Sequence, residues 1–267
     1  MLDTEGRLVG INTFILSGSG GSMGISFAVP VNMARDVMDR ITKEGRVVRG
    51  YLGVFVQPVT DELAKMFNLP DESGALVGGV AAGSPAAHAG LKEGDLIIAF
   101  DGKKVSDSRH LRLIVAQTRP NTKVTLDALR ENKKLTPTLT LGELPPRQAA
   151  AAAPTSRGSH PAVPRGDSLS LEGVDVTDLD SRLRQQFSIP AEVTGALVMN
   201  VDAGTPAHEA GLRPGDVVLE INRQKVRNSR DAIELTRKIK DRALLRVWSK
   251  GGNRFVVIET PRKEKSG

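Results

Sequence analysis

The sequence contains no cysteine among its 267 residues, which excludes disulfide bonds, thiolate metal sites and cysteine nucleophiles. Aromatic residues make up only 3% of the chain, so its cores must be built mainly from Val, Ile, Leu and Ala. No apolar run approaches the roughly 20 residues of a membrane-spanning helix. The N-terminus also lacks the basic stretch and apolar core of a signal peptide.

Two further classes of function have little support. The balance of 37 basic and 31 acidic residues gives a net charge of +6, but the charges are scattered and are not interleaved with aromatic residues, so we expect no nucleic-acid partner. None of the histidines has a second ligand at metal-binding spacing. We therefore predict no metal site and no cofactor. The four histidines are His88, His110, His160 and His208.

What the chain does contain is an internal repeat. The stretch VAAGSPAAHAGLKEGD at 80–95 returns as VDAGTPAHEAGLRPGD at 201–216. A fixed offset between similar segments indicates two copies of one structural unit, which agrees with the two domains expected for this length. Between the copies lies a segment rich in Pro, Ala, Ser and Gly without apolar periodicity, which predicts a mobile linker.

Local signals predict the same elements in both copies. Ser84 and Thr205 are good helix N-caps, and each is followed by a proline at the first helical position. Apolar strands follow, and then a second helix, over 106–118 in the first copy and 228–239 in the second. We therefore predict that each copy is a small β-barrel-like unit with two helices.

A short glycine-containing loop precedes the repeated stretch in each copy. A glycine there lets successive backbone N–H groups point into one concavity that can hold a peptide carboxylate. The strand that follows is predicted to offer a free edge to the peptide. A purely structural alternative is that the glycine marks a bulge at the start of a strand. The predicted carboxylate-binding residues are Tyr51, Leu52, Gly53 and Val54 in the first copy and Leu171, Glu172, Gly173 and Val174 in the second.

The two loops are not equivalent in charge. Glu172 replaces an apolar residue and Asp175 follows in the strand, and acidic side chains beside an anion site disfavour a carboxylate. Arg46 and Arg49 precede the first loop, where exposed cations contribute about 1 kcal/mol or less. We therefore predict that the first copy binds peptides with a free, apolar C-terminus and that the second binds them more weakly.

These motifs carry a family resemblance. YLGV at 51–54 together with SPAAHAGLKEGDLI at 84–97 resembles a PDZ domain, and two such domains in tandem resemble the C-terminal half of the HtrA/Deg serine endoproteases (DegP/DegQ-like, Do-type). The segment at 5–41 resembles the end of the family's chymotrypsin-like protease domain, with two strands, an intervening loop SGSGGS and a helix. Ala34, Val37, Met38 and Ile41 recur at helical spacing in that segment.

The resemblance implies a fold that is mainly β with short helices (α+β): the terminal piece of a chymotrypsin-like β-barrel followed by two PDZ domains. The expected domains are a protease-domain remnant at 1–45, a first PDZ domain at 46–144, a flexible linker at 145–169 and a second PDZ domain at 170–262.

The resemblance also implies which residues are missing. The family's nucleophilic serine lies in a Gly-Asn-Ser-Gly-Gly turn just before the stretch that begins here at Leu2, and its His and Asp lie further upstream. No residue of this sequence matches the triad, so we predict no catalytic residue and no cleavage of casein by this chain alone. The serines of the N-terminal segment have no positioned base nearby, and the loop at 18–22 lacks the Gly-Lys-Ser/Thr of a phosphate site.

Two functions follow from this pattern. The first is the C-terminal portion of a quality-control endoprotease, truncated or fragmentary, whose PDZ domains bind unfolded proteins or peptide C-termini. Its full-length parent is expected to form homo-oligomers in the periplasm. The alternative is a free-standing tandem PDZ adaptor. The segment at 2–41 favours the first, because an adaptor has no use for it, although its amides should exchange readily without the rest of a barrel.

Overall fold

The computed structural model describes residues 1–15, 24–69, 71–145, 173–239, 241–250 and 252–259, together with the backbone of 167–168. These residues form two compact units, Met1–Arg49 and Gly50–Gly267. Strands predominate and the helices are short, which confirms the predicted class.

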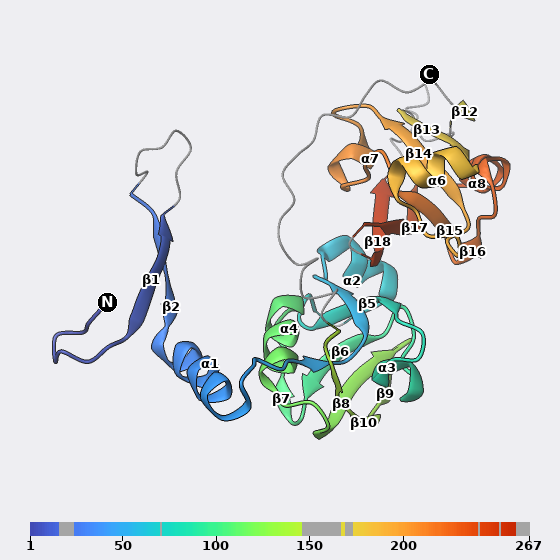
Figure 1. The fold of residues 1–267 in the computed structure, drawn as a ribbon. Helices are drawn as coiled ribbons and strands as arrows, with labels where there is room; N and C mark the ends of the chain where they lie inside the picture. The colour runs from blue at the N-terminus through green and yellow to red at the C-terminus, as the bar shows by residue number, and fades with distance from the viewer. Residues whose placement is uncertain are drawn as a thin grey trace. The chain divides into compact units, whose positions relative to one another are not determined.

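The first unit is one hairpin followed by one helix (Figure 1). Strand β1 (Gly10–Ile15) pairs antiparallel with β2 (Ser26–Pro30), and α1 (Val31–Glu44) follows. The glycine-rich loop between the two strands lies outside the described residues. Apolar side chains of this unit stay exposed, including Phe14 at 59% and Met38 at 59%. One hairpin and one helix offer too little surface to bury them.

The first repeat copy is built on a seven-stranded sheet with the order β10-β8-β6-β5-β4. Strand β7 pairs with β6 and β9 pairs with β8, while β3 pairs with β11 in a separate ladder. The strands are β3 (Gly50–Tyr51), β4 (Val54–Gln57), β5 (Ala75–Val80), β6 (Leu96–Phe100), β7 (Lys103–Lys104), β8 (Lys123–Arg130), β9 (Lys133–Leu135), β10 (Thr138–Thr140) and β11 (Gly142–Glu143). The helices are α2 (Asp61–Phe67), α3 (Pro85–His88) and α4 (Ser108–Gln117).

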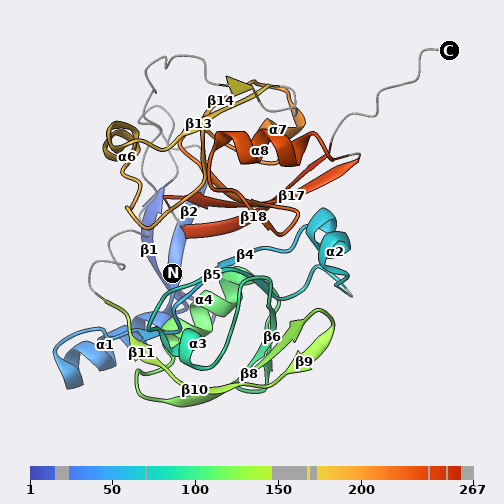
Figure 2. The ribbon, with the colours of Figure 1, turned by 90° about the vertical axis from the view of Figure 1, so that its right-hand side faces the viewer.

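The second copy repeats this plan, with the strand order β12-β13-β14-β15-β17-β18. Its last two strands form a long hairpin (Figure 2). The strands are β12 (Asp167–Ser168), β13 (Val174–Asp178), β14 (Ala196–Val201), β15 (Val217–Ile221), β16 (Gln224–Lys225), β17 (Arg242–Ser249) and β18 (Gly252–Glu259). The helices are α6 (Ser181–Phe187), α7 (Pro206–Glu209) and α8 (Ser229–Thr236).

The predicted caps are confirmed. Ser84 Oγ accepts the Ala87 N–H at 3.2 Å, and Thr205 Oγ1 accepts the His208 N–H at 3.3 Å. The predicted number of helices is wrong, because each copy has a third helix, α2 or α6. Both are seven residues long, too short for a helical period to stand out. Their N-caps, Thr60 and Asp180, were the available signal.

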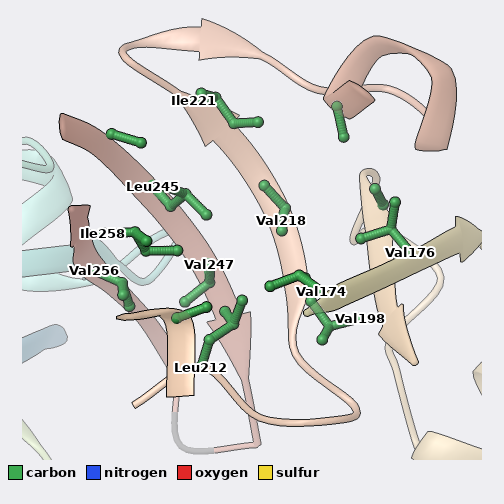
Figure 3. Close-up of a cluster of buried hydrophobic side chains, with 14 of the residues drawn as sticks. Val174, Val176, Val198, Leu212, Val218, Ile221, Leu245, Val247, Val256 and Ile258 are labelled. Atoms are coloured by element: carbon green, nitrogen blue, oxygen red, sulfur yellow. The ribbon is translucent and has the colours of Figure 1, made fainter. Parts of the chain in front are cut away.

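Each copy has its own aliphatic core, as the scarcity of aromatics requires. The core of the first copy includes Leu111 and Val115 of α4 together with residues from most strands. Figure 3 shows the corresponding core of the second copy, where side chains from β13, β14, β15, β17 and β18 converge. The labelled residues are Val174, Val176, Val198, Leu212, Val218, Ile221, Leu245, Val247, Val256 and Ile258.

A third apolar cluster joins the two copies. Leu63 and Leu76 of the first copy are buried together with Leu244 and Phe255 of the second. The Gln57 side chain reinforces this contact, because its Nε2 donates to the Phe255 carbonyl at 3.0 Å and its Oε1 accepts the Phe255 N–H at 2.6 Å. The copies are therefore packed against each other within the unit at 50–267.

Candidate functional site

The first glycine loop is held tightly by the start of α3. Gly53 has φ +82°, and a Cβ placed on it would lie 2.1 Å from the Ser84 Cβ, so only glycine fits here. The Ala86 N–H donates to the Leu52 carbonyl at 2.9 Å, and the Ala81 N–H donates to the Gly53 carbonyl at 2.9 Å. These bonds turn both loop carbonyls toward the protein.

The loop amides have no such partners. Among the described residues, no oxygen accepts the N–H of Leu52 or of Gly53, although Leu52 is only 3% exposed and Gly53 is also buried. Buried backbone donors are nearly always paired in folded proteins. Two adjacent unpaired donors form an arrangement suited to an anion such as a carboxylate.

Strand β4 leaves this loop with one open edge. Within the part of the chain that the structure describes, β4 is the end of its sheet and pairs with β5 alone. Its Val54 and Val56 side chains pack against the core that includes α4, whereas Phe55 points to the other face and is 39% exposed. Arg112 of α4 reaches this edge, where its Nη2 donates to the Val56 carbonyl at 3.2 Å. An extended peptide can therefore add along β4 beside the unpaired amides.

The second loop shares the backbone shape but not the surroundings. Gly173 has φ +80°, and its carbonyl accepts the Asp202 N–H at 2.7 Å. The Asp202 carboxylate lies close by, because a Cβ placed on Gly173 would be 3.1 Å from its Oδ2. Ala81 occupies the matching position in the first copy. Of the four residues predicted for this loop, Gly173 and Val174 are described, and Leu171 and Glu172 lie outside the described residues.

The free edge predicted for the second copy is not found. Strand β12 pairs antiparallel with β13 on the side away from β14, with Asp167 opposite Val176 and Ser168 opposite Asp175. This is the edge of β13 that corresponds to the open edge of β4. The chain itself supplies the strand here, from residues that composition had assigned to the linker.

Sequence reasoning missed three of these features. Asp202 was visible as the aspartate in VDAG where the first copy has VAAG, and Arg112 was visible as a cation between two leucines of the predicted helix. The β12 pairing had no signal, because Asp167 and Ser168 are typical of loops.

The described histidines and acidic side chains do not gather into a metal site. His110 Nδ1 lies 3.2 Å from Ser106 Oγ, a local contact at the start of α4. No group of three or more potential metal-ligating His, Asp or Glu side chains occurs among the described residues. No helix in that part of the chain is both long and apolar enough to span a bilayer.

Both repeat copies match models of a known protein domain. A model of the PDZ domain matches residues 50–141, and a second PDZ-domain model matches residues 197–249. The first match includes the capping residues Ser84 and Pro85, and the second includes Thr205 and Pro206. Each copy is therefore a PDZ domain.

Curated relatives extend the likeness to nearly the whole chain. A probable periplasmic serine endoprotease DegP-like of Chlamydia trachomatis serovar D is 35% identical over 261 residues, which cover 97% of this chain and 49% of that protein. Proteins with the same description from Rhizobium meliloti and Pseudomonas fulva are 35% and 34% identical, over 95% and 97% of this chain and 49% and 53% of theirs. The chain thus spans about half the length of the curated relatives it matches.

Solved structures that the chain matches in part include an HtrA-type protease, AlgW, with a decapeptide. It is 44% identical, with a TM-score of 0.48, over 54% of this chain and 44% of that one. A serine endoprotease from Yersinia pestis is 30% identical, with a TM-score of 0.40, over 54% of this chain and 46% of that one. The chain therefore contains two PDZ domains and is related over nearly its whole length to the DegP-like serine endoproteases of the HtrA/Deg family.

Proposed function

We propose that this chain is the peptide-binding part of an HtrA-type endoprotease of protein quality control. The homology extends beyond the PDZ domains into the unit at 1–49, which favours a protease-associated role over a free-standing adaptor. Its relatives are described as periplasmic, and we propose the same compartment for this chain. The proposed partners are unfolded proteins and peptide C-termini, with homo-oligomers formed by the full-length protein.

The first PDZ domain is proposed as the principal binding copy. The observation that supports this assignment is the pair of unpaired amides at Leu52 and Gly53, directly beside the open edge of β4 in the part of the chain that the structure describes. A peptide along this edge would gain main-chain hydrogen bonds with β4, and its terminal carboxylate would accept the two amides. Tyr51 and Val54 complete the loop at its two ends.

The second PDZ domain is proposed to bind peptides more weakly. Its corresponding strand edge is paired with β12, and Asp202 adds a negative charge beside Gly173. A peptide would have to displace β12 and place its carboxylate next to an acidic side chain. This arrangement suits a contribution to assembly better than peptide capture.

The test is a comparison of two peptides on the full chain. A fluorescein-labelled ten-residue peptide with a free C-terminal valine is titrated by anisotropy beside its C-terminally amidated twin. We expect the free acid to bind at least tenfold more tightly, because charge-assisted hydrogen bonds contribute about 1.5–3 kcal/mol. Equal affinities would show that the loop does not bind the carboxylate.

A further inference from the structure

The open edge of β4 carries a cation from the neighbouring helix. Arg112 is the fifth residue of α4, its side chain is exposed, and its Nη2 donates to the Val56 carbonyl at 3.2 Å. A guanidinium has five N–H donors, and this contact uses one of them. Within the described residues, Arg112 forms no ion pair with an acidic side chain. The remaining donors are thus open to a ligand beside Val56.

The geometry of β4 determines which peptide residue would meet Arg112. With the terminal carboxylate on the amides of Leu52 and Gly53, the last peptide residue lies opposite Val54. Because both strands rise equally per residue, the third residue from the C-terminus then lies opposite Val56. Residues paired across antiparallel strands point to the same face of the sheet.

That face is the one covered by α4. The Val56 side chain packs against the core that contains Leu111 and Val115 of this helix. The side chain of the third-from-last peptide residue would therefore point toward α4, where the Arg112 guanidinium lies.

We infer that Arg112 is a specificity-determining residue that selects an acidic side chain at the third position from the peptide C-terminus. The inference rests on the proposed peptide binding by the first PDZ domain. A carboxylate there would accept two N–H groups of the planar guanidinium, whereas an amide offers one uncharged acceptor and an ammonium is repelled.

The second PDZ domain lacks this selectivity device. Its fifth helical residue is Ile233 of α8, which is partly buried against the core of that domain. The strand residue that matches Val56 is Val176, whose edge faces β12. The acidic preference is thus a property of the first domain alone.

The experiment uses three labelled peptides that differ only at the third-from-last residue and end in Glu-Ala-Val, Gln-Ala-Val or Lys-Ala-Val. Each is titrated by anisotropy with the full chain and with Arg112→Gln, Arg112→Lys and Lys133→Gln. Lys133 is an exposed residue of β9, across the sheet from β4, so Lys133→Gln removes the same charge at a remote place. The amidated twin of the glutamate peptide is the control for carboxylate binding.

We expect the unmodified chain to bind the glutamate peptide about fivefold more tightly than the glutamine peptide, because a partly exposed ion pair contributes up to about 1 kcal/mol. The lysine peptide should bind most weakly. Arg112→Gln should reduce the glutamate-to-glutamine ratio to about one, Arg112→Lys should retain part of it, and Lys133→Gln should leave it unchanged. The ratio should also fall as salt is added.

Equal affinity of the unmodified chain for the glutamate and glutamine peptides would overturn the inference, and so would a ratio that survives Arg112→Gln. In both cases the proposed function stands as long as the free acid binds more tightly than its amidated twin. If no peptide binds, or if the amidated twin binds equally well, the proposed function fails and the inference fails with it.

Discussion

Replacement of Gly53 by valine tests the loop most directly. At φ +82° an L-residue is strained by about 1–2 kcal/mol. The new Cβ would also lie 2.1 Å from the Ser84 Cβ, whereas carbon atoms prefer about 3.5–4.0 Å, so the loop and α3 must separate by about 1.5 Å. That movement breaks the bonds from Ala86 N–H to Leu52 and from Ala81 N–H to Gly53, each with a net contribution of about 1 kcal/mol.

The sum is a destabilisation of about 3–4 kcal/mol in the first PDZ domain, together with displaced amides. We expect Gly53→Val to reduce the affinity for a free C-terminal peptide by more than tenfold. Binding is measured by anisotropy and stability by urea denaturation, both on the full chain.

Two matched variants separate the causes. Gly83 has φ +68° but open space around its Cβ position, so Gly83→Val introduces the strain without the clash. It should cost about 1–2 kcal/mol and leave peptide affinity largely intact. Gly173→Val disturbs the matching loop of the second domain and should also leave most binding in place. The reasoning is refuted if Gly53→Val binds like the unmodified chain, or if Gly173→Val is the variant that loses binding.

Two further predictions concern stability. Asp95 is fully buried, and its carboxylate accepts hydrogen bonds from Arg130 Nε at 2.7 Å and Nη2 at 2.8 Å. Asp95→Asn should therefore lower the unfolding free energy measured in urea by about 2 kcal/mol. Asp127→Asn, which disturbs the more exposed pair with Lys134, should lower it by under about 1 kcal/mol, and equal losses would contradict the role of burial. Asp107 caps α4, and the hydrogen bond from the His110 N–H is the main cause that lowers the pKa of its carboxyl below 3.8. The stability that the ionised Asp107 carboxylate contributes is present above pH 3.8 and is lost as the pH falls through its folded-state pKa. The difference in unfolding free energy between the unmodified chain and Asp107→Ala should therefore shrink in acid. A difference that grows in acid would contradict this cap.

Much of this protein was evident from sequence because the decisive signals are local. The Ser84-Pro85 and Thr205-Pro206 caps act within one helical turn, and the repeat itself needs no structure to be recognised. The position of Gly53 in a tight loop with positive φ was also predictable, since a positive φ is a property of the residue and its neighbours. The boundaries of the four expected domains and the binding roles of the two loops stay predictions.

Only the tertiary structure decided which edges and faces those loops meet. Arg112 lies 56 residues from Val56 in the sequence, and β12 pairs with β13 through residues that look like linker. The contact of Gln57 with Phe255 spans 198 residues. Such contacts depend on how strands and helices pack, and loop-forming or solvent-facing residues carry little pattern that predicts them. The sequence thus determined two similar domains, whereas packing made the strand edge of one open and that of the other occupied.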